Sequence, residues 1–365
     1  MAWSSPALLS WHFLRGGLEL LRLLCMAVFD VSKLPPGMFV DAFTAPCGVF
    51  FLTHARSDHM NGLGHASWRR GLIHCTDTAA KLLIARRACD PHILRPHELE
   101  EEFYVDSPLS PCGIYRSVAT LVDAFHCPGS AMIVLESLDG KSAIVNTGDM
   151  RWCPEMQESR ALKRIAACGT VEHLFLDTTW AHPHLLHLPR QSDSIDAAVD
   201  VIEAGSASDT IVLHSFFGDE ELLRGIAAAT AHRGRLLFAS ESRFSEVNIC
   251  DRDLSRSCER LASNCARGRV VVVEGRGWRS DKRLQHLDCI ELSCSTLWWA
   301  THAPALLSER TRPMSSGGIW RVLFAMHPSL SELRELVAFL SNLHQTLDDR
   351  RTAEKGSCQK DTHTH

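Results

Sequence analysis

Four polar loops, each placed after an apolar, strand-like run, constrain this chain more than any other feature of its sequence. Each loop presents a histidine or an aspartate at the point where the preceding strand is expected to end. The loops lie at residues 54–59, 123–129, 147–149 and 324–329. Because the carboxyl ends of parallel strands meet at one edge of a sheet, side chains that are far apart in sequence can converge there. We therefore expect one site to be built from four distant segments.

Strand-like and helical patterns alternate along the chain. Runs typical of strands lie at 38–53, 118–125, 131–137, 142–147, 171–177, 211–217 and 269–274. Helical patterns lie at 76–89, 192–204, 219–232 and 329–344. The residues expected to cap three of these helices are Thr76 or Asp77, Ser192 or Ser194, and the capping box of Ser329 and Glu332. This alternation predicts a layered α/β fold.

Length, charge and cysteine usage limit the class of protein. A chain of 365 residues suits one large domain or two coupled domains. A formal net charge of -5 does not suit a general polyanion binder, so a nucleic-acid contact would need a local basic patch. The 14 cysteines include no CxxC pair, which argues against both a zinc finger and a small disulfide scaffold. Reduced, mostly buried thiols indicate a cytosolic or nuclear protein.

The two ends of the chain lack the pattern of a folded core. Residues 1–25 combine basic residues such as Arg15 with many leucines. This pattern is typical of an amphipathic helix, of an extension upstream of a start at Met26, or of a transit segment. The apolar run at 18–29 is too short and too charged to span a bilayer. The polar tail after Gln345 has no apolar periodicity and is predicted to be disordered.

Histidine and aspartate at strand ends point to a metal centre. Imidazole and carboxylate are the ligands of catalytic zinc sites, which leave one coordination position open for water. Two such metals can stabilise both the attacking and the leaving oxygen of a phosphodiester. Any one of these histidines, taken alone, is more often a hydrogen-bonded structural residue, and Gly148-Asp149 alone would be a turn. Four such loops in this order are much harder to explain by chance.

The loops also carry motifs of a known family. The segment FFLTHARSDHMNGL resembles the His-x-His-x-Asp-His metal motif of the metallo-β-lactamase superfamily. The segments LVDAFHCPGSAM, IVNTGDMRW, VEHLFLDTTW and AMHPSLSELRELVAFL resemble motifs of the DNA cross-link repair nucleases. The resemblance runs from about residue 38 to residue 343, with a spacing nearest to the Apollo-type 5′ exonuclease branch. The chain thus resembles the metallo-β-lactamase/β-CASP family of DNA cross-link repair nucleases.

This resemblance implies a four-layer αβ/βα metallo-β-lactamase sandwich with an inserted β-CASP domain. In such a fold the chain leaves the first domain and returns to it, because His327 would complete a site that begins at His54. The implied segments are an N-terminal extension at 1–25, the metallo-β-lactamase domain at 26–180, the β-CASP domain at 181–310, the return segment of the first domain at 311–345 and a disordered tail at 346–365.

The resemblance also implies a role for each residue that matches a family motif. The implied metal ligands are His54 and His126 for a first zinc, Asp58, His59 and His327 for a second zinc, and Asp149 as a bridge between them. Asp41 matches an aspartate that supports the ligands from outside. Asp177 matches the acid that orients the late histidine, and such partners fix the tautomer of a ligand.

Three positions depart from the family pattern. Arg56 stands where the first motif has its second histidine, and a guanidinium only donates hydrogen bonds, so it cannot bind zinc. It could instead place a positive charge at the first metal position or pair with a phosphate oxygen. Asp219 stands where the family has a lysine, and Ser329 alone remains of three serines. The residues expected to carry the chemistry, at a reduced rate, are Asp58, His59, Asp149 and Arg56.

A basic stretch at residues 267–283 is the candidate nucleic-acid contact. Cations interleaved with a tryptophan can track phosphates and stack a base. A solvated charged face explains the same pattern equally well. The predicted contact residues are Arg276, Trp278, Arg279, Lys282, Arg283 and, from the last loop, Ser329. The pair Trp298-Trp299 is expected in the core.

The resemblance implies a zinc-dependent 5′-to-3′ DNA exonuclease that acts in interstrand cross-link or chromosome-end repair. The implied reaction is metal-hydroxide attack on a phosphodiester, with one or two zinc ions. DNA and repair or telomere proteins are the implied partners, no membrane is involved, and the implied location is the nucleus. If residues 1–25 act as a transit segment, the location would instead be mitochondrial.

Two alternative functions stay open at this point. A catalytically impaired DNA-binding scaffold is favoured by Arg56 and opposed by the retained set of Asp58, His59, Asp149 and His327. An RNA-processing β-CASP nuclease would use the same chemistry on the other polymer. The HCPGS motif and the short inserted region favour DNA over RNA.

Overall fold

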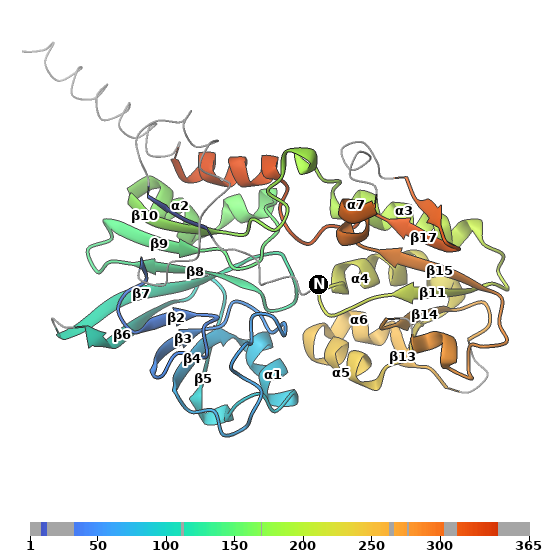
Figure 1. Ribbon diagram of the computed structural model, residues 1–365, viewed down its shortest axis with the longest axis horizontal. Coiled ribbons are helices and arrows are strands. Elements are labelled where there is room, and N and C mark those ends of the chain that lie inside the picture. Colours follow the sequence, from blue (N-terminus) through green and yellow to red (C-terminus); the bar gives the residue numbers. More distant parts are fainter. Residues whose placement is uncertain are drawn as a thin grey trace, which may run out of the picture. The chain divides into compact units, whose positions relative to one another are not determined.

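The computed structural model describes residues 9–12, 33–110, 113–168, 170–262, 266–275, 277–302 and 312–341. The chain forms two compact units of mixed α/β structure (Figure 1). Unit 1 comprises Met1–Phe125, Ser130–Ala181 and Leu330–His365, and unit 2 comprises His126–Gly129 and His182–Ser329. The predicted α/β class is confirmed, and each unit has its own sheets and core.

Unit 1 contains two β-sheets. The six-stranded sheet has the order β1-β10-β9-β8-β7-β6, with β1 at Leu9–His12, β6 at Glu102–Ser110, β7 at Gly113–Asp123, β8 at Ala131–Glu136, β9 at Ser142–Asn146 and β10 at Thr170–Leu176. The parallel four-stranded sheet comprises β2 at Met38–Val40, β3 at Gly48–Phe51, β4 at Gly71–Thr76 and β5 at Leu94–His97. The helices and 3₁₀ turns of unit 1 are α1 at Asp77–Ala85, η3 at Pro91–Ile93, η4 at Pro154–Glu158, α2 at Arg160–Cys168 and the helix at 330–341.

The two sheets of unit 1 share one apolar core. Met38 and Phe51 of the four-stranded sheet pack with Leu121 and Ile133 of the six-stranded sheet. The opposite face of the six-stranded sheet is covered by α2 and by the helix at 330–341, from which Leu333 is buried. α1 packs beside β4 and β5. Because the sheet faces are buried, polar side chains can gather only in the loops at the strand ends.

Unit 2 is built around one seven-stranded sheet of the order β13-β12-β14-β11-β15-β17-β16. All neighbours in this sheet are parallel except β16 and β17. The strands are β11 at Thr210–His214, β12 at Leu236–Phe238, β13 at Cys258–Arg260, β14 at Val270–Val273, β15 at Cys289–Cys294, β16 at Met314–Ser316 and β17 at Ile319–Val322. The helices are α3 at Gln191–Ala204, α4 at Glu220–Ala229, α5 at Glu241–Cys250, α6 at Arg252–Arg256 and α7 at Thr296–His302, with 3₁₀ turns η5 at Pro183–Leu185, η6 at Ala231–Arg233 and η7 at Gly277–Ser280.

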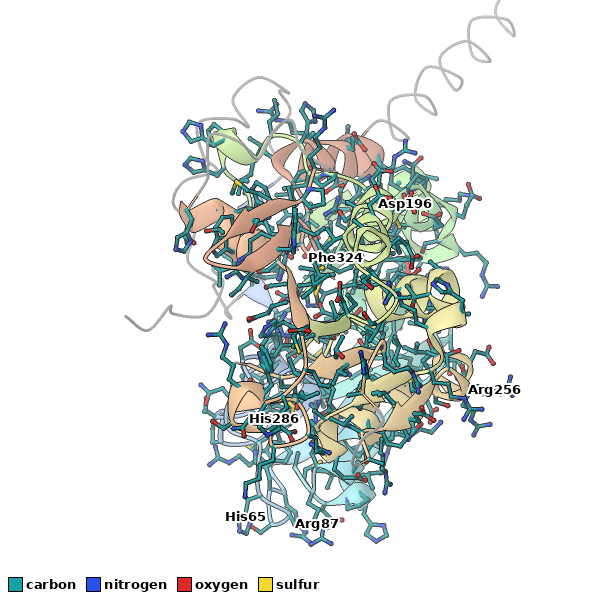
Figure 2. All side chains as sticks on the ribbon, turned by 90° about the vertical axis from the view of Figure 1, so that its right-hand side faces the viewer. His65, Arg87, Asp196, Arg256, His286 and Phe324 are labelled. Atoms are coloured by element: carbon teal, nitrogen blue, oxygen red, sulfur yellow. The ribbon has the colours of Figure 1, made fainter. Side chains whose placement is uncertain are left out.

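Helices cover the parallel sheet of unit 2 as its sequence pattern requires. The four valines of β14 are all buried, as expected for a central strand covered on both faces. α3 is amphipathic, because Ala198 and Ile202 are buried whereas Asp196 is exposed. Phe324 lies in the same core as α3, while Arg256 projects from the surface (Figure 2).

The structure confirms one of the predicted helix caps and contradicts another. Thr76 caps α1 as predicted, because its side chain accepts a hydrogen bond from the amide of Ala79 at 3.2 Å. The predicted serine caps of α3 are wrong, because that helix begins at Gln191 after Arg190, which makes no side-chain cap bond. Ser194 lies inside the first turn and donates to the carbonyl of Arg190.

Two further predictions are corrected by long-range packing. Leu9–His12 do not form a helix but the strand β1, which pairs antiparallel with β10 and satisfies the backbone groups of that edge. Trp299 lies in the core as predicted, whereas Trp298 is only half-buried, with its ring stacked on His302 and under the guanidinium of Arg321. The predicted disordered tail lies outside the described residues. Among the described helices, none is long and apolar enough to cross a membrane.

Candidate metal centre

The loop that follows β3 gathers three possible metal ligands in unit 1. His54 and His59 are buried, with their ring centroids 4.1 Å apart, whereas Asp58 is exposed. One ligand atom from each of these three residues lies within 4.8 Å of the others. Imidazole and carboxylate donors at this separation can bind one divalent metal ion.

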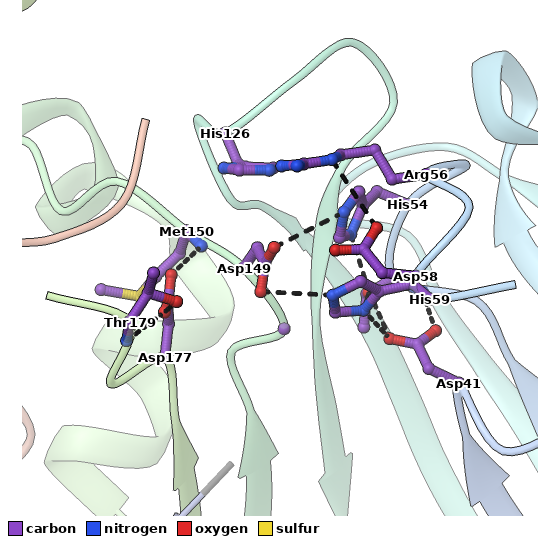
Figure 3. Close-up of polar contacts among 12 residues, drawn as sticks. Asp41, His54, Arg56, Asp58, His59, His126, Asp149, Met150, Asp177 and Thr179 are labelled. Carbon is purple, nitrogen blue, oxygen red and sulfur yellow. Dashed lines mark hydrogen bonds and ion pairs between the residues drawn. The ribbon is translucent and has the colours of Figure 1, made fainter. Parts of the chain in front are cut away.

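Asp41 and Thr53 support this loop through hydrogen bonds, and the carboxylate of Asp41 lies beside the ring of His59 (Figure 3). Asp41 has a positive φ of 52°, which is uncommon for a residue other than glycine and marks a position set by its surroundings. Its Oδ1 accepts from the amide of Thr53 at 2.9 Å, and its Oδ2 accepts from the Thr53 hydroxyl at 2.6 Å. The same Oδ2 lies 2.7 Å from Nδ1 of His59. This contact directs Nε2 of His59 toward the centre, as a supporting carboxylate does for a metal ligand.

Asp149 is the second predicted carboxylate ligand, and it lies beside His54 and His59 in unit 1. It follows β9 and is buried, with Oδ1 3.3 Å from Nε2 of His59 and Oδ2 3.7 Å from Nε2 of His54 (Figure 3). Two contacts anchor the residues that follow Asp149. Asp177 accepts a hydrogen bond from the amide of Met150 at 3.1 Å, and Arg151 forms an ion pair with Glu332 at 3.0 Å.

The carboxylates of this cluster favour a positive charge at His59. Burial by itself lowers the pKa of His59, but the carboxylates of Asp149 and Asp41 outweigh it and raise the pKa to about 11. Two carboxylates facing one ring therefore hold a cation at this position. A divalent metal on Nε2 would replace the proton and satisfy the same carboxylates, so the donor set of His54, Asp58, His59 and Asp149 fits a metal ion.

The loop that follows β9 packs so closely against the loop that follows β3 that position 148 requires a glycine. Its φ is +52°, and a Cβ added there would lie 2.7 Å from Cβ of Thr53, the residue that holds Asp41. We expect Gly148→Ala to lower the free energy of unfolding by about 1–2 kcal/mol through backbone strain and by about 1–3 kcal/mol more through overpacking.

The matched control for this prediction is Gly140→Ala, measured with Gly148→Ala by urea denaturation. Gly140 also has a positive φ, +66°, but a Cβ there would meet no atom within 4 Å. It should show the backbone strain without the overpacking. Equal losses in the two variants would mean that Gly148 does not set the spacing of the loops.

Arg56 lies on the same loop after β3 and forms an ion pair there. Its Nε is 3.7 Å from Oδ1 of Asp58, and the two side chains are 34% and 39% exposed. Because a guanidinium has no lone pair to offer, Arg56 adds charge to the centre and no ligand.

The two other predicted ligands belong to unit 2. The rings of His126 and His327 lie with their centroids 4.6 Å apart. Nδ1 of the buried His126 lies 2.9 Å from the carbonyl oxygen of Met326, which can only accept, so Nδ1 carries the proton and Nε2 is the atom available to a metal. Both units thus contribute predicted ligands, four from unit 1 and two from unit 2.

Several residues of the predicted nucleic-acid contact interact with other residues of unit 2. Arg279 pairs with Glu291 at 2.7 Å, and Arg283 pairs with Asp281 at 2.5 Å. Trp278 packs against the core and helps to line a cavity of about 360 Å³ at the carboxyl ends of β12 and β14. The remaining predicted contact residues are exposed Lys282, buried Ser329, and Arg276, which lies outside the described residues.

Sequence reasoning did not find the buried ion pair that supports the 218–220 segment. Glu220 and Arg243 are 2% and 1% exposed, and their charged atoms are 2.6 Å apart. Arg243 also donates to the carbonyl of Phe216 at 2.8 Å. Burial raises the pKa of neighbouring Asp219 to about 6. The chain separation of 23 residues between the partners leaves no local signal for this contact.

Known proteins are similar in sequence to most of the chain. No family model matches it. The DNA cross-link repair protein SNM1 of Arabidopsis thaliana is 29% identical over 344 residues, covering 85% of this chain and 63% of that protein. The 5′ exonuclease Apollo of Mus musculus is 30% identical over 297 residues, covering 80% of this chain and 49% of that protein. Apollo of Gallus gallus is 29% identical over 296 residues, covering 80% and 56%.

The chain spans only about half to two thirds of the length of these relatives. A solved structure of a protein of unknown function from Enterococcus faecalis V583 covers 80% of this chain and 73% of its own, with a TM-score of 0.49 and 12% identity. The sequence similarity confirms the predicted relationship: the DNA cross-link repair protein SNM1 and the Apollo 5′ exonucleases are homologues of this chain.

Proposed function

We propose that this protein is a zinc-dependent 5′-to-3′ DNA exonuclease of interstrand cross-link or chromosome-end repair, with DNA as its substrate and the nucleus as its location. The observation that carries the proposal is the buried cluster of His54, His59 and Asp149, with Asp58 beside it, in a chain related to SNM1 and Apollo. We also propose that unit 1 is the metallo-β-lactamase domain and unit 2 the β-CASP domain, and that His126 and His327 are metal ligands as well.

The chain's own residues have distinct tasks in this reaction. A bound zinc ion supplies Lewis acidity toward a phosphoryl oxygen and makes water a better nucleophile at neutral pH. Asp41 fixes the ring of His59, and Thr53 fixes Asp41. Asp149 offers one oxygen toward each histidine. Arg56 is exposed enough to pair with a phosphate oxygen of the substrate.

The test is digestion of DNA and RNA strands of one sequence, each with a 5′-phosphate and a 3′ fluorescent label, by the purified full chain. We expect DNA shortened stepwise from its 5′ end, loss of the reaction in EDTA and recovery on adding zinc. The label stays on every intermediate, so the ladder reports polarity directly. Faster digestion of RNA would favour the RNA-processing alternative. Binding of DNA without hydrolysis at any metal concentration would favour the scaffold alternative, which Arg56 supports.

A further inference from the structure

The loop between β11 and α4 of unit 2 presents an exposed aromatic ring on a fixed backbone. Phe216 is 55% exposed, although Ser215 and Gly218 of the same loop are buried. The amide of Phe216 donates to Oδ2 of Asp219 at 2.9 Å. Its carbonyl accepts from Arg243 at 2.8 Å and from the amide of Asp219 at 3.2 Å. Both backbone polar groups of Phe216 are therefore held in place, although more than half of the residue is exposed.

The side chains that hold this loop are charged and buried. Asp219 is buried, and the ion-paired atoms of Arg243 and Glu220 lie 2.6 Å apart in side chains that are 1% and 2% exposed. Removing charged groups from water costs free energy that pairing offsets only in part. Single exposed apolar residues are common on protein surfaces, but one whose backbone is fixed by buried charges is not explained by chance exposure. A side chain that is fixed and still exposed is suited to binding a ligand.

The loop lies beside two proposed metal ligands of the same unit. A Cβ added at Gly218, whose φ is +110°, would meet the end of the Met326 side chain and would lie 3.4 Å from Cβ of Cys127. Met326 precedes His327 in the chain, and Cys127 follows His126. The loop also follows β11, the central strand of the sheet, and ligands of such α/β sheets bind at the carboxyl ends of the strands. The exposed ring is thus two residues from a position that packs against the neighbours of both proposed ligands.

We infer that Phe216 binds the substrate by stacking on a nucleobase close to the phosphodiester that is cleaved. This inference rests on the proposed function, because it takes DNA as the substrate and His126 and His327 as metal ligands. A phenyl ring offers a flat apolar face, and every base has a matching face, so the contact tolerates any sequence, as digestion by an exonuclease requires. Residues 215–219 contain no basic side chain, so this loop can hold DNA by stacking but not by pairing a cation with phosphate.

The experiment measures DNA binding and digestion by the zinc-loaded full chain. The KM and the rate at saturating substrate are measured on DNA with a single-stranded 5′ end and a 3′ fluorescent label. The Kd is measured by fluorescence anisotropy on the same DNA with phosphorothioate linkages at its 5′ end, which slow hydrolysis. The variants are Phe216→Ala, Phe216→Leu, which keeps apolar bulk without a flat face, and Phe216→Trp, which keeps the face. Trp320→Ala is the matched control, because Trp320 is another exposed aromatic residue of unit 2 but lies on β17.

We expect Phe216→Ala and Phe216→Leu to raise the Kd and the KM by roughly tenfold, within the range for losing one stacked base. The rate at saturating DNA should change by less than about threefold, because the ring carries no charge or proton and contributes to binding alone. Phe216→Trp and Trp320→Ala should stay within about twofold of the wild type in every quantity, because both keep a flat ring at position 216. The ratio of the Kd of Phe216→Ala to that of the wild type should not change with salt concentration, because stacking releases no counterions.

A second measurement locates the stacked base. A single abasic site is placed at successive positions from the 5′ end of the DNA. It should weaken binding by the wild type most at one position close to that end. At this position it should have no further effect on Phe216→Ala, because the variant has already lost the same contact.

The outcomes separate this inference from the proposed function. If the wild type digests DNA and Phe216→Ala has the same Kd and the same response to every abasic site, the inference is wrong and the proposed function stands. Equal losses in Phe216→Ala and Phe216→Trp would mean that the loop rather than the ring contacts DNA, which also overturns the inference. A wild type that binds DNA through Phe216 but never cleaves it would overturn the proposed function alone. Absence of both binding and digestion would overturn both.

Discussion

Replacing Asp149 with alanine is expected to lower the metal-dependent nuclease rate of this chain by at least about a thousand-fold. The carboxylate of Asp149 lies 3.7 Å from Nε2 of His54 and 3.3 Å from Nε2 of His59. In the proposed metal centre, its loss removes a metal ligand and also the charge that balances a cation at this place. Metal-ion catalysis contributes several kcal/mol of transition-state stabilisation, and each 1.4 kcal/mol corresponds to about tenfold in rate. His59→Ala should have an effect of the same order, because it removes the ring that Asp41 orients.

The measurement is the single-turnover rate on 5′-phosphorylated DNA, together with zinc content and the circular dichroism of each variant. Cys75→Ala is the matched control, because Cys75 is a buried core residue of unit 1 outside the metal cluster. It should leave the rate within about threefold of the wild type, since it removes one small buried group. Activity that survives in Asp149→Ala at the wild-type level would mean that another site, or a contaminant, hydrolyses the DNA.

Arg243→Ala is expected to give the largest loss of stability, about 3–5 kcal/mol in the free energy of unfolding. Arg243 is 1% exposed and pairs with Glu220, which is 2% exposed. Without Arg243, the carboxylate of Glu220 would be left buried beside that of Asp219 with no compensating charge. The carbonyl of Phe216 would also lose the Arg243 donor and keep the hydrogen bond from the amide of Asp219 at 3.2 Å. Unfolding by guanidinium chloride, followed by tryptophan fluorescence, would measure the loss.

Arg256→Ala is the control for this measurement. Arg256 is 79% exposed and pairs with Asp253, which is 85% exposed. Exposed pairs of this kind contribute little, so the change should stay within about 0.5 kcal/mol. The double variant Arg243→Met with Glu220→Leu should recover much of the loss, because it removes both buried charges together. A loss below about 1 kcal/mol in Arg243→Ala would mean that water reaches Glu220 and that the pair is not a structural support of unit 2.

The sequence alone was sufficient for the features that depend on local pattern. The run of four valines predicts a buried central strand, because an apolar strand with both faces covered has no polar alternation. Thr76 before an amphipathic run predicts a capped helix, since a short hydroxyl side chain can reach an amide three residues on. The loop motifs predicted the relationship to SNM1 and Apollo, because ligand spacing within one loop is a property of the chain itself.

The tertiary structure decided every feature that depends on partners far apart in sequence. Asp41 reaches His59 across 18 residues, and Arg151 reaches Glu332 from another segment of unit 1, so no local pattern reports these contacts. The sequence of the basic stretch indicated a cationic surface. In the structure, however, Arg279 pairs with Glu291 and Arg283 pairs with Asp281. Ion pairing depends on distance in space, whereas composition only counts charges. For the same reason the sequence identified Arg56 as a departure from the family motif, whereas its pairing with Asp58 is seen only in the folded loop.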